Sequence, residues 1–476
     1  MNTSPVVHLA SEGRMAFETH GGKIELKLSA EALTPFGGRV PWAAFEKHTG
    51  ILKRLAATCP VERTSPNAAP VYDVLCSFAL TALCDGTRFN HVQRLREDPT
   101  VSEICGLEAV VGDDAIRRLF YRVDEAAGRA WVAAAARPIW SALPERIIQD
   151  WDSTVQTKYG HQEGAEVGYN PQKRGRRSFH PLLAVVAGTR LCNYYRWRRG
   201  DSATASEWIG AMEECQQWLG PVQRVWLNRG DLGFAQEKIM AWHELGAKRP
   251  YYLFKLKLTA NVRRAIAALP ESAWQGPASA GVLQVAELNL KLWGWSQGRR
   301  VVVGRRFLGV IPAANRGEFW DQTRHEFGVY VTNLPVAQAN AWQVVELYRQ
   351  RADTENVFDE LKNQWGFNGF CTQQAHATAL AARVLLLVYN LWNLFLRLLQ
   401  PQRHVEARHG RRWFLLIAAR LVHSGGAKAI QIAVQGRWWE MLKDGYQRVL
   451  GWLEATAPQL SSLRDLRPVP LPLQAE

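Results

Sequence analysis

The sequence predicts a mixed α/β protein, with an α/β core that carries a β-rich insertion and has a helical region on each side. Three observations lead to this prediction. The hydrophobic pattern is helical over residues 41–144 and again over 371–476. Short strand patterns surround one amphipathic helix between residues 145 and 249. Strand-like runs then fill residues 250–333, before a helical pattern returns over 334–370.

Composition and charge limit the class of partner. The chain has 476 residues, of which 47% are hydrophobic and 10% aromatic, which suffices for packed cores in two to four domains. A net charge of +14 favours a polyanionic partner such as DNA. The seven cysteines form no CxxC pair, which argues against a disulfide framework and a zinc knuckle. No signal-peptide pattern is found at the N-terminus, and we expect a cytoplasmic protein.

The N-terminal part consists of an arm and a helical region. The arm covers residues 1–40 and contains a strand-like alternation at 23–28. Within the helical region, Gly112 precedes two aspartates that can cap a helix reaching Val123. The other face of that helix shows Arg117, Arg118 and Arg122. A short helix, a turn and a basic helix are typical of a helix-turn-helix DNA reader, and a plain helical bundle is the alternative.

The predicted core follows in the order strand, strand, strand, helix, strand. These elements cover residues 146–155, 180–186, 191–197, 206–219 and 222–227. Asp152 lies on the first strand, and Asp231 lies just past the carboxyl end of the last, where open α/β sheets place their sites. A turn-rich connection carries Lys173, Arg174, Arg176 and Arg177, which we expect either to follow phosphates or to form a solvated loop.

The insertion and the C-terminal region raise two further questions. Trp293 and Trp295 in the insertion could stack on a base flipped out of DNA, or pack in the core. Residues 377–399 are apolar enough to span a bilayer, but four polar residues interrupt them: Arg383, Asn390, Asn393 and Arg397. We therefore expect a buried helix and no membrane. The tail, with Pro468, Pro470 and Pro472, is predicted to be disordered.

The segment from Tyr348 to Lys362 carries the most informative spacing. Tyr348, Arg351, Glu355 and Lys362 follow one another at offsets of three, four and seven residues. On a single α-helix these offsets fall on one stripe. A solvated helix with an Arg351–Glu355 ion pair is the structural alternative to a functional face.

This spacing resembles the Y-(2)-R-(3)-E-(6)-K signature of DDE-class transposases of bacterial insertion sequences. Asp152-Ser153-Thr154 is similar to the D-x-T of that family, and residues 228–234 are similar to its R-x-D-x-G-F. The resemblance covers residues 145–370 and implies a ribonuclease-H-like catalytic core. Asp150 lies two residues before Asp152 and faces the same side of a strand, so either one could be the first carboxylate.

The resemblance implies a chemistry and partners. Asp152, Asp231 and Glu355 would be the catalytic ligands of two Mg²⁺ ions, with Mn²⁺ as an alternative. Tyr348, Arg351 and Lys362 would contact the DNA backbone near the cut. The protein would act as a homodimer on double-stranded DNA, cutting at the ends of its mobile element and joining them to a target. The alternatives are a transposase-derived DNA-binding protein without strand transfer and a structure-specific nuclease.

Overall fold

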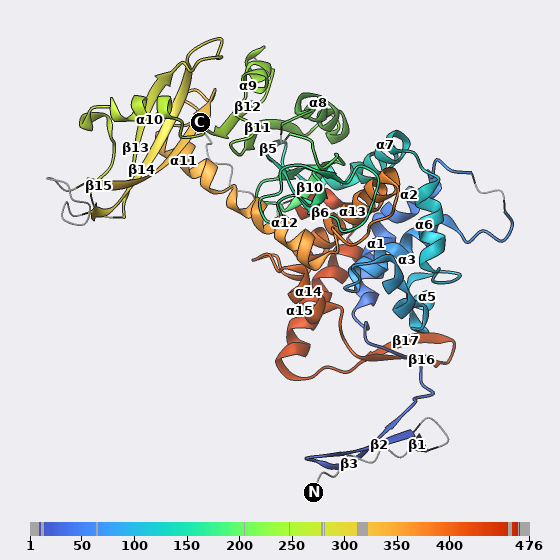
Figure 1. Ribbon diagram of the computed structural model, residues 1–476. Coiled ribbons are helices and arrows are strands. Elements are labelled where there is room, and N and C mark those ends of the chain that lie inside the picture. The colour runs from blue at the N-terminus through green and yellow to red at the C-terminus, as the bar shows by residue number, and fades with distance from the viewer. Residues whose placement is uncertain are drawn as a thin grey trace, which may run out of the picture.

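A computed structural model describes residues 9–10, 14–62, 65–203, 205–246, 248–277, 279, 281–311, 322–455, 459–464 and 466. The Pro-rich tail lies outside these residues. Figure 1 shows a helical body, a long sheet that extends away from it, and a hairpin near the N-terminus that stands apart from the body. The hairpin is formed by β2 (Arg14–Thr19) and β3 (Gly22–Lys27), with the short β1 (Leu9–Ala10) at its edge.

The central sheet has eight strands in the order β10-β9-β5-β11-β12-β15-β14-β13. It is a mixed sheet, and the predicted α/β class is confirmed. In chain order the strands are β5 (Arg146–Ser153), β9 (Leu182–Val186), β10 (Leu191–Arg196), β11 (Arg224–Gly230), β12 (Tyr251–Lys255), β13 (Leu283–Leu290), β14 (Arg299–Ile311) and β15 (Gln322–Thr332).

Strand direction divides this sheet into two parts. β9 is antiparallel to β5 and β10 is antiparallel to β9, whereas β11 runs parallel to β5 and β12 parallel to β11. The helices α8 (Trp208–Leu219) and α9 (Glu237–Glu244) connect the parallel strands. Beyond them, β15 pairs antiparallel with β12, so the insertion strands β13–β15 continue the same sheet. Strand β12, which falls within the predicted insertion, pairs in parallel with β11. Periodicity predicts a strand but not its partners.

The segment that we expected as one helix is two. Helix α11 (Ala341–Arg349) ends before Gln350, and α12 (Ala352–Gln364) begins after Arg351. The Arg351 amide donates to the Tyr348 carbonyl at 3.0 Å, which is the tighter turn of a 3₁₀ type. The four signature residues therefore do not share one uninterrupted stripe. Neither proline nor glycine marks the break, which coincides with the contacts of Arg351 to Asp152 and to the Trp151 carbonyl.

The helical body is organised around α13 (Ala375–Leu399), which is buried along its whole apolar window, as predicted for residues 377–399. By length and composition alone this helix could cross a membrane. Around it pack helices from both ends of the chain: α1 (Arg39–Thr49), α3 (Val71–Leu83), α6 (Asp113–Tyr121), α7 (Glu125–Ala136) and α15 (Gly436–Glu454). The smaller helices of the body are α2 (Ile51–Ala57), α4 (Gln93–Arg96), α5 (Thr100–Cys105) and α14 (Ala407–Phe414).

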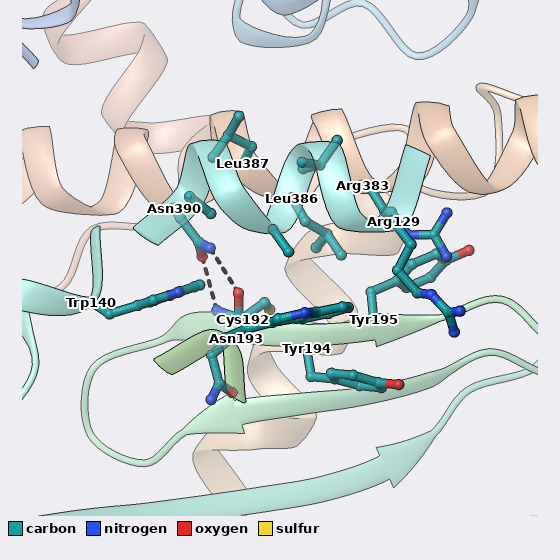
Figure 2. A pocket seen from close by; sticks show the side chains of 14 residues that line it. Arg129, Trp140, Cys192, Asn193, Tyr194, Tyr195, Arg383, Leu386, Leu387 and Asn390 are labelled. Atoms are coloured by element: carbon teal, nitrogen blue, oxygen red, sulfur yellow. Dashed lines mark hydrogen bonds between the residues drawn. The ribbon is translucent and has the colours of Figure 1, made fainter. Parts of the chain in front are cut away.

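Three polar residues of α13 bind other parts of the protein. The Asn390 side chain accepts from the backbone N–H of Cys192 at 2.8 Å and donates to its carbonyl at 2.7 Å, closing part of the free edge of β10 (Figure 2). Arg397 donates to the Thr189 carbonyl at 3.0 Å, and Arg383 pairs with Glu125 of α7. Each of these contacts reaches another element of the protein, so the polar positions serve internal packing.

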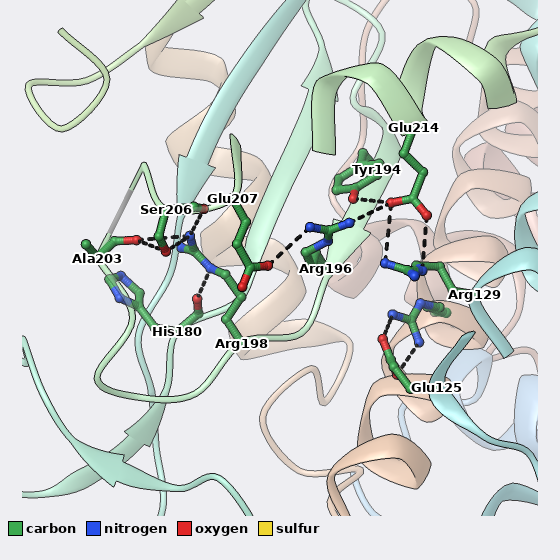
Figure 3. A network of polar contacts seen from close by, with 11 residues as sticks. Glu125, Arg129, His180, Tyr194, Arg196, Arg198, Ala203, Ser206, Glu207 and Glu214 are labelled. Carbon is green, nitrogen blue, oxygen red and sulfur yellow. Dashed lines mark hydrogen bonds and ion pairs between the residues drawn. The ribbon is translucent and has the colours of Figure 1, made fainter. Parts of the chain in front are cut away.

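A chain of charged contacts joins the body to the sheet (Figure 3). Glu214 of α8 lies at its centre. Its carboxylate accepts hydrogen bonds from Tyr194 at 2.6 Å and from Arg196 at 3.0 Å, both on β10, and lies 3.1 Å from Arg129 of α7. Arg196 also reaches Glu207 at 3.1 Å. The network therefore links α7, the edge strand and α8.

The C-terminal region departs from the all-helical prediction for residues 371–455. A hairpin of β16 (Ala419–Ser424) and β17 (Ala427–Ile432) interrupts the helices, and β16 pairs with β4 (Leu33–Thr34) of the arm. Its turn is Gly425-Gly426, with φ of 57° and 79°. Two successive glycines with positive φ are typical of a two-residue hairpin turn, so the sequence did contain the signal.

Candidate active site

Two aspartates meet at the carboxyl edge of the parallel strands. Strand register places Gly230 of β11 opposite Trp151 of β5, so Asp231 and Asp152 follow at the next position on neighbouring strands. Strands lie about 5 Å apart, so these carboxylates are close neighbours. Burial raises the pKa of Asp152, Arg351 opposes that shift, and Asp231 adds to it. The predicted position of Asp231 just past a strand end is confirmed.

The structure separates Asp150 from Asp152. The Asp150 carboxylate is fully buried and accepts from Arg229 Nε at 2.6 Å, from Arg229 Nη2 at 2.7 Å and from the Thr354 hydroxyl at 2.9 Å. The Asp152 side chain is 18% exposed and accepts from Arg351 Nη2 at 2.6 Å and from the Ser153 amide at 2.7 Å. Asp150 is thus enclosed and saturated with donors, whereas solvent reaches Asp152. This difference favours Asp152 as the ligand.

Arg229 connects the two strands beside the aspartates to helix α11. It lies on β11 beside Asp231, pairs with Asp150 of β5, and donates through Nη1 to the Leu347 carbonyl of α11. Its guanidinium is fully buried. The sequence analysis included Arg229 in the motif of residues 228–234 but predicted no role for it. The signal is its position two residues before Asp231, at the end of a buried strand.

Glu355 lies in the first turn of α12 and is exposed. Within the described residues its carboxylate makes no hydrogen bond or ion pair, and the expected alternative of an Arg351–Glu355 pair is not seen. Glu355 lines an open groove of about 1180 Å³ between the helical body and the core. Five cations line the same groove: Arg88, Arg117, Lys158, Lys173 and Lys362.

Two lysines of the groove, Lys362 and Lys158, are partly or fully buried. Burial lowers the pKa of Lys362, and nearby Asp152 and Asp359 oppose the shift. Burial also lowers the pKa of Lys158, whose Nζ donates to the Asn368 carbonyl at 3.0 Å and lies 5.0 Å from the centre of the Phe179 ring. Sequence reasoning missed Lys158, because nothing in its local pattern shows that the chain folds it against residue 368.

The other signature residues lie deeper than Lys362. Arg351 is 5% exposed and bound to Asp152 and to the Trp151 carbonyl at 3.1 Å. Tyr348 packs with its ring centre 4.6 Å from that of Tyr330, and burial raises the pKa of its phenol. Of the three predicted backbone-contacting residues, Lys362 is the one that lines the groove.

The predicted basic surfaces are placed as follows. Arg117 lines the groove and pairs with Asp113 and Asp114, the latter at 3.0 Å. Arg118 is on α6, whereas Arg122 lies past its end and donates to the Glu62 carbonyl at 2.8 Å.

The predicted basic loop lies beside Tyr159, with Lys173 5.0 Å and Arg176 6.0 Å from the centre of the Tyr159 ring. Arg174 is exposed there, and Arg177 on β8 donates to the Ala165 carbonyl at 3.4 Å. The small sheet beneath comprises β6 (Gln156–Thr157), β8 (Arg177–Phe179) and β7 (Glu166–Val167).

The two tryptophans of the insertion differ. Trp293 is 97% exposed, at the turn between β13 and β14. Trp295 is partly buried, and its ring centre lies 5.2 Å from the Arg299 guanidinium. Neither is among the residues that line the groove in the described part of the chain. Full exposure makes Trp293 available for stacking, whereas Trp295 has a packing role.

The donor set suits a hard divalent cation. Carboxylate oxygens are the ligands that Mg²⁺ and Mn²⁺ prefer, and a few of them with substrate phosphate suffice. Within the described residues, no three His, Cys, Asp or Glu side chains lie close enough together to hold a metal by themselves. Asp152 and Asp231 are neighbours, whereas Glu355 lines the groove from helix α12. The residues therefore fit a metal site in which carboxylates and a substrate phosphate together would provide the ligands.

Comparison with protein families identifies the class of protein. Residues 18–451 match the family described as Transposase DDE domain group 1. The chain belongs to this family of DDE-class transposases. No curated protein matches the chain. Among solved structures, the cryo-EM structure of a piggyBac transposase synaptic complex with hairpin DNA is similar, with 12% identity and a TM-score of 0.41, covering 92% of this chain and 87% of that chain.

Proposed function

We propose that the protein is the transposase of a bacterial insertion sequence. It binds the ends of its element, cleaves DNA by metal-assisted hydrolysis and joins the 3′-OH ends to target DNA. The observation that carries the proposal is the pair Asp152 and Asp231 at one sheet edge, beside a basic groove that Glu355 lines. Family membership supports the same conclusion.

The core topology supports a ribonuclease-H-like assignment. Numbered along the chain, the five core strands lie in the order 3-2-1-4-5, with the second antiparallel to its neighbours and the last two parallel to the first. This arrangement is the one that the sequence resemblance implies. It brings the first and fourth strand ends together, which is where the two aspartates lie.

Asp152, Asp231 and Glu355 would hold the metal. Two bound Mg²⁺ or Mn²⁺ ions supply charge stabilisation for the attacking and leaving oxygens of an in-line displacement. The chain's own residues bind and orient the DNA. Lys362 and Lys158 offer point charges to phosphates in the groove. Arg351 orients the Asp152 carboxylate through its 2.6 Å contact and would act on the DNA backbone near the cut from that place.

The partners follow from the same proposal. Double-stranded DNA from the element ends and the target fills the groove, and a homodimer brings two ends together in the cytoplasm. The Arg117 face of α6 and the loop at Tyr159 extend the basic surface on either side of Glu355. Tyr348 is proposed to support the backbone contacts, and Trp293 to stack on a displaced base.

Cleavage by the wild type and by Glu355→Gln tests the proposal on DNA that carries the element's own ends, with Mg²⁺. We expect the variant to bind DNA normally and to cut about a thousandfold more slowly, because a metal ligand contributes several kcal/mol to transition-state stabilisation. Equal cutting by both proteins would contradict the role of Glu355. Binding without cutting by either protein would favour a DNA-binding descendant. Cutting without joined products would favour a nuclease.

A further inference from the structure

A second open groove, of about 960 Å³, lies at the opposite edge of the same sheet, where the parallel strands begin. Its lining includes the first residues of three core strands, Arg146 of β5, Arg224 of β11 and Tyr251 of β12, and the turn before β12 with Lys248 and Arg249. We call this the amino-edge groove. It is separate from the groove that Glu355 lines, and the two share no lining residue.

Three of the four cations that line the amino-edge groove have no partner within the described residues. Arg146, Arg224 and Lys248 are exposed, and within the described residues their side chains make no hydrogen bond or ion pair. Arg249 lies 3.6 Å from Glu213 and stacks 4.0 Å from the Trp242 ring centre. Glu244 is the acidic residue in the lining, and its carboxylate is bound by Arg299 at 2.8 Å. The groove is therefore strongly positive.

The strand register adds an independent observation. Arg146 and Arg224 are direct partners in the parallel pairing of β5 and β11. Two like charges opposite each other on neighbouring strands destabilise a sheet, since each raises the energy of the other. A bound anion between the two guanidinium groups removes the repulsion.

We propose that the amino-edge groove binds the phosphate backbone of a second duplex DNA segment, distinct from the one that is cut. This inference rests on the proposed function, which brings two DNAs to one protein. An open groove of this size, lined by unpaired cations and by the aromatic rings of Trp226 and Tyr251, suits a long polyanion better than a small enclosed ligand. Its place at the opposite sheet edge keeps this DNA away from the acidic residues.

The test uses full-length protein with Arg146→Gln, Arg224→Gln and Lys248→Gln combined. The affinity for a long duplex is measured by fluorescence anisotropy at increasing salt, without divalent metal. We expect weaker binding and a log–log salt slope that is smaller by about 2 to 3, since each phosphate contact contributes about 0.9. The matched control removes three exposed cations outside both grooves, Arg54, Arg437 and Lys443, and should keep the wild-type slope.

Two outcomes would overturn the proposal. One is an equal slope in the triple variant and the control, because the groove then contacts no phosphates. The other is a loss of single-stranded RNA binding equal to the loss of duplex binding, because the site then lacks preference for a duplex. The melting temperature of the free triple variant should be unchanged or higher, which separates lost contacts from misfolding. Because no metal is present, failed cleavage by the wild type would not affect this measurement.

Discussion

The two edges of the central sheet are built from the same strands but handle charge in opposite ways. At the carboxyl edge of β5 and β11, Asp150 pairs with Arg229 and Asp152 with Arg351. At the amino edge of the same strands, Arg146 is the register partner of Arg224, and neither has an acidic partner within the described residues. The buried carboxylates of one edge are paired inside the protein, whereas the guanidinium groups of the other edge are not paired by any described residue.

The difference separates charged residues that stabilise the fold from charged residues that are available for binding a partner. A buried, doubly hydrogen-bonded guanidinium such as Arg229 fixes the relative position of three elements. An exposed pair such as Arg146 and Arg224 contributes nothing favourable to the free protein. Substitutions at the two edges should therefore separate stability from binding.

The largest effect on stability is expected at the carboxyl edge. Arg229→Ala leaves the buried Asp150 carboxylate without its cation and should lower the free energy of unfolding by about 3–5 kcal/mol. Urea denaturation followed by circular dichroism measures this loss. Arg224→Ala, at the other end of the same strand, serves as the control and should show no loss of unfolding free energy. Equal losses in the two variants would remove the distinction between the edges.

A smaller effect should appear with pH at the amino edge, where His243 lines the groove. Its Nδ1 donates to the Ile239 carbonyl at 2.8 Å, and burial lowers the pKa of His243 from 6.5 to about 4. Because the unfolded chain takes up a proton at higher pH than the folded protein, stability is lost as pH falls from about 6.5 to about 4. The expected loss is about 3 kcal/mol.

Unfolding free energies at pH 7 and pH 4.5 measure this loss, and His243→Gln provides the comparison. The variant should lose less stability over the same interval, since it has no group to protonate there. A wild type and a variant with identical pH dependence would show that His243 is free to become charged in the folded protein.

The smallest effect is a gain. Arg224→Gln removes one of two facing like charges and should raise the unfolding free energy by about 0.2–1 kcal/mol in low salt. The gain should fade at high salt, because exposed charges are screened. Arg54→Gln, on the exposed face of α2, should produce no such salt-dependent change. A loss of stability in Arg224→Gln would mean that Arg146 and Arg224 do not repel each other.

Sequence patterns predicted the core strands and the place of Asp231, because alternation and turn residues are local signals. They did not reveal the break between α11 and α12, which coincides with the contact from Arg351 to Asp152, 199 residues earlier in the chain. The same limit applies to the facing arginines. In the sequence each arginine is an ordinary residue of a strand. Their repulsion arises only from the register of β5 with β11, which makes them neighbours.

The central place of α13 has a consequence for synthesis. Helices α3, α6 and α7 bury their apolar faces against a helix that begins about 230 residues after the end of their own region. At about 5–20 residues per second, a ribosome needs roughly 10 to 50 s to cover that distance. During this delay the first helices lack their central partner and expose apolar surface. The N-terminal helices therefore complete their packing only after α13, in the last third of the chain, has been synthesised.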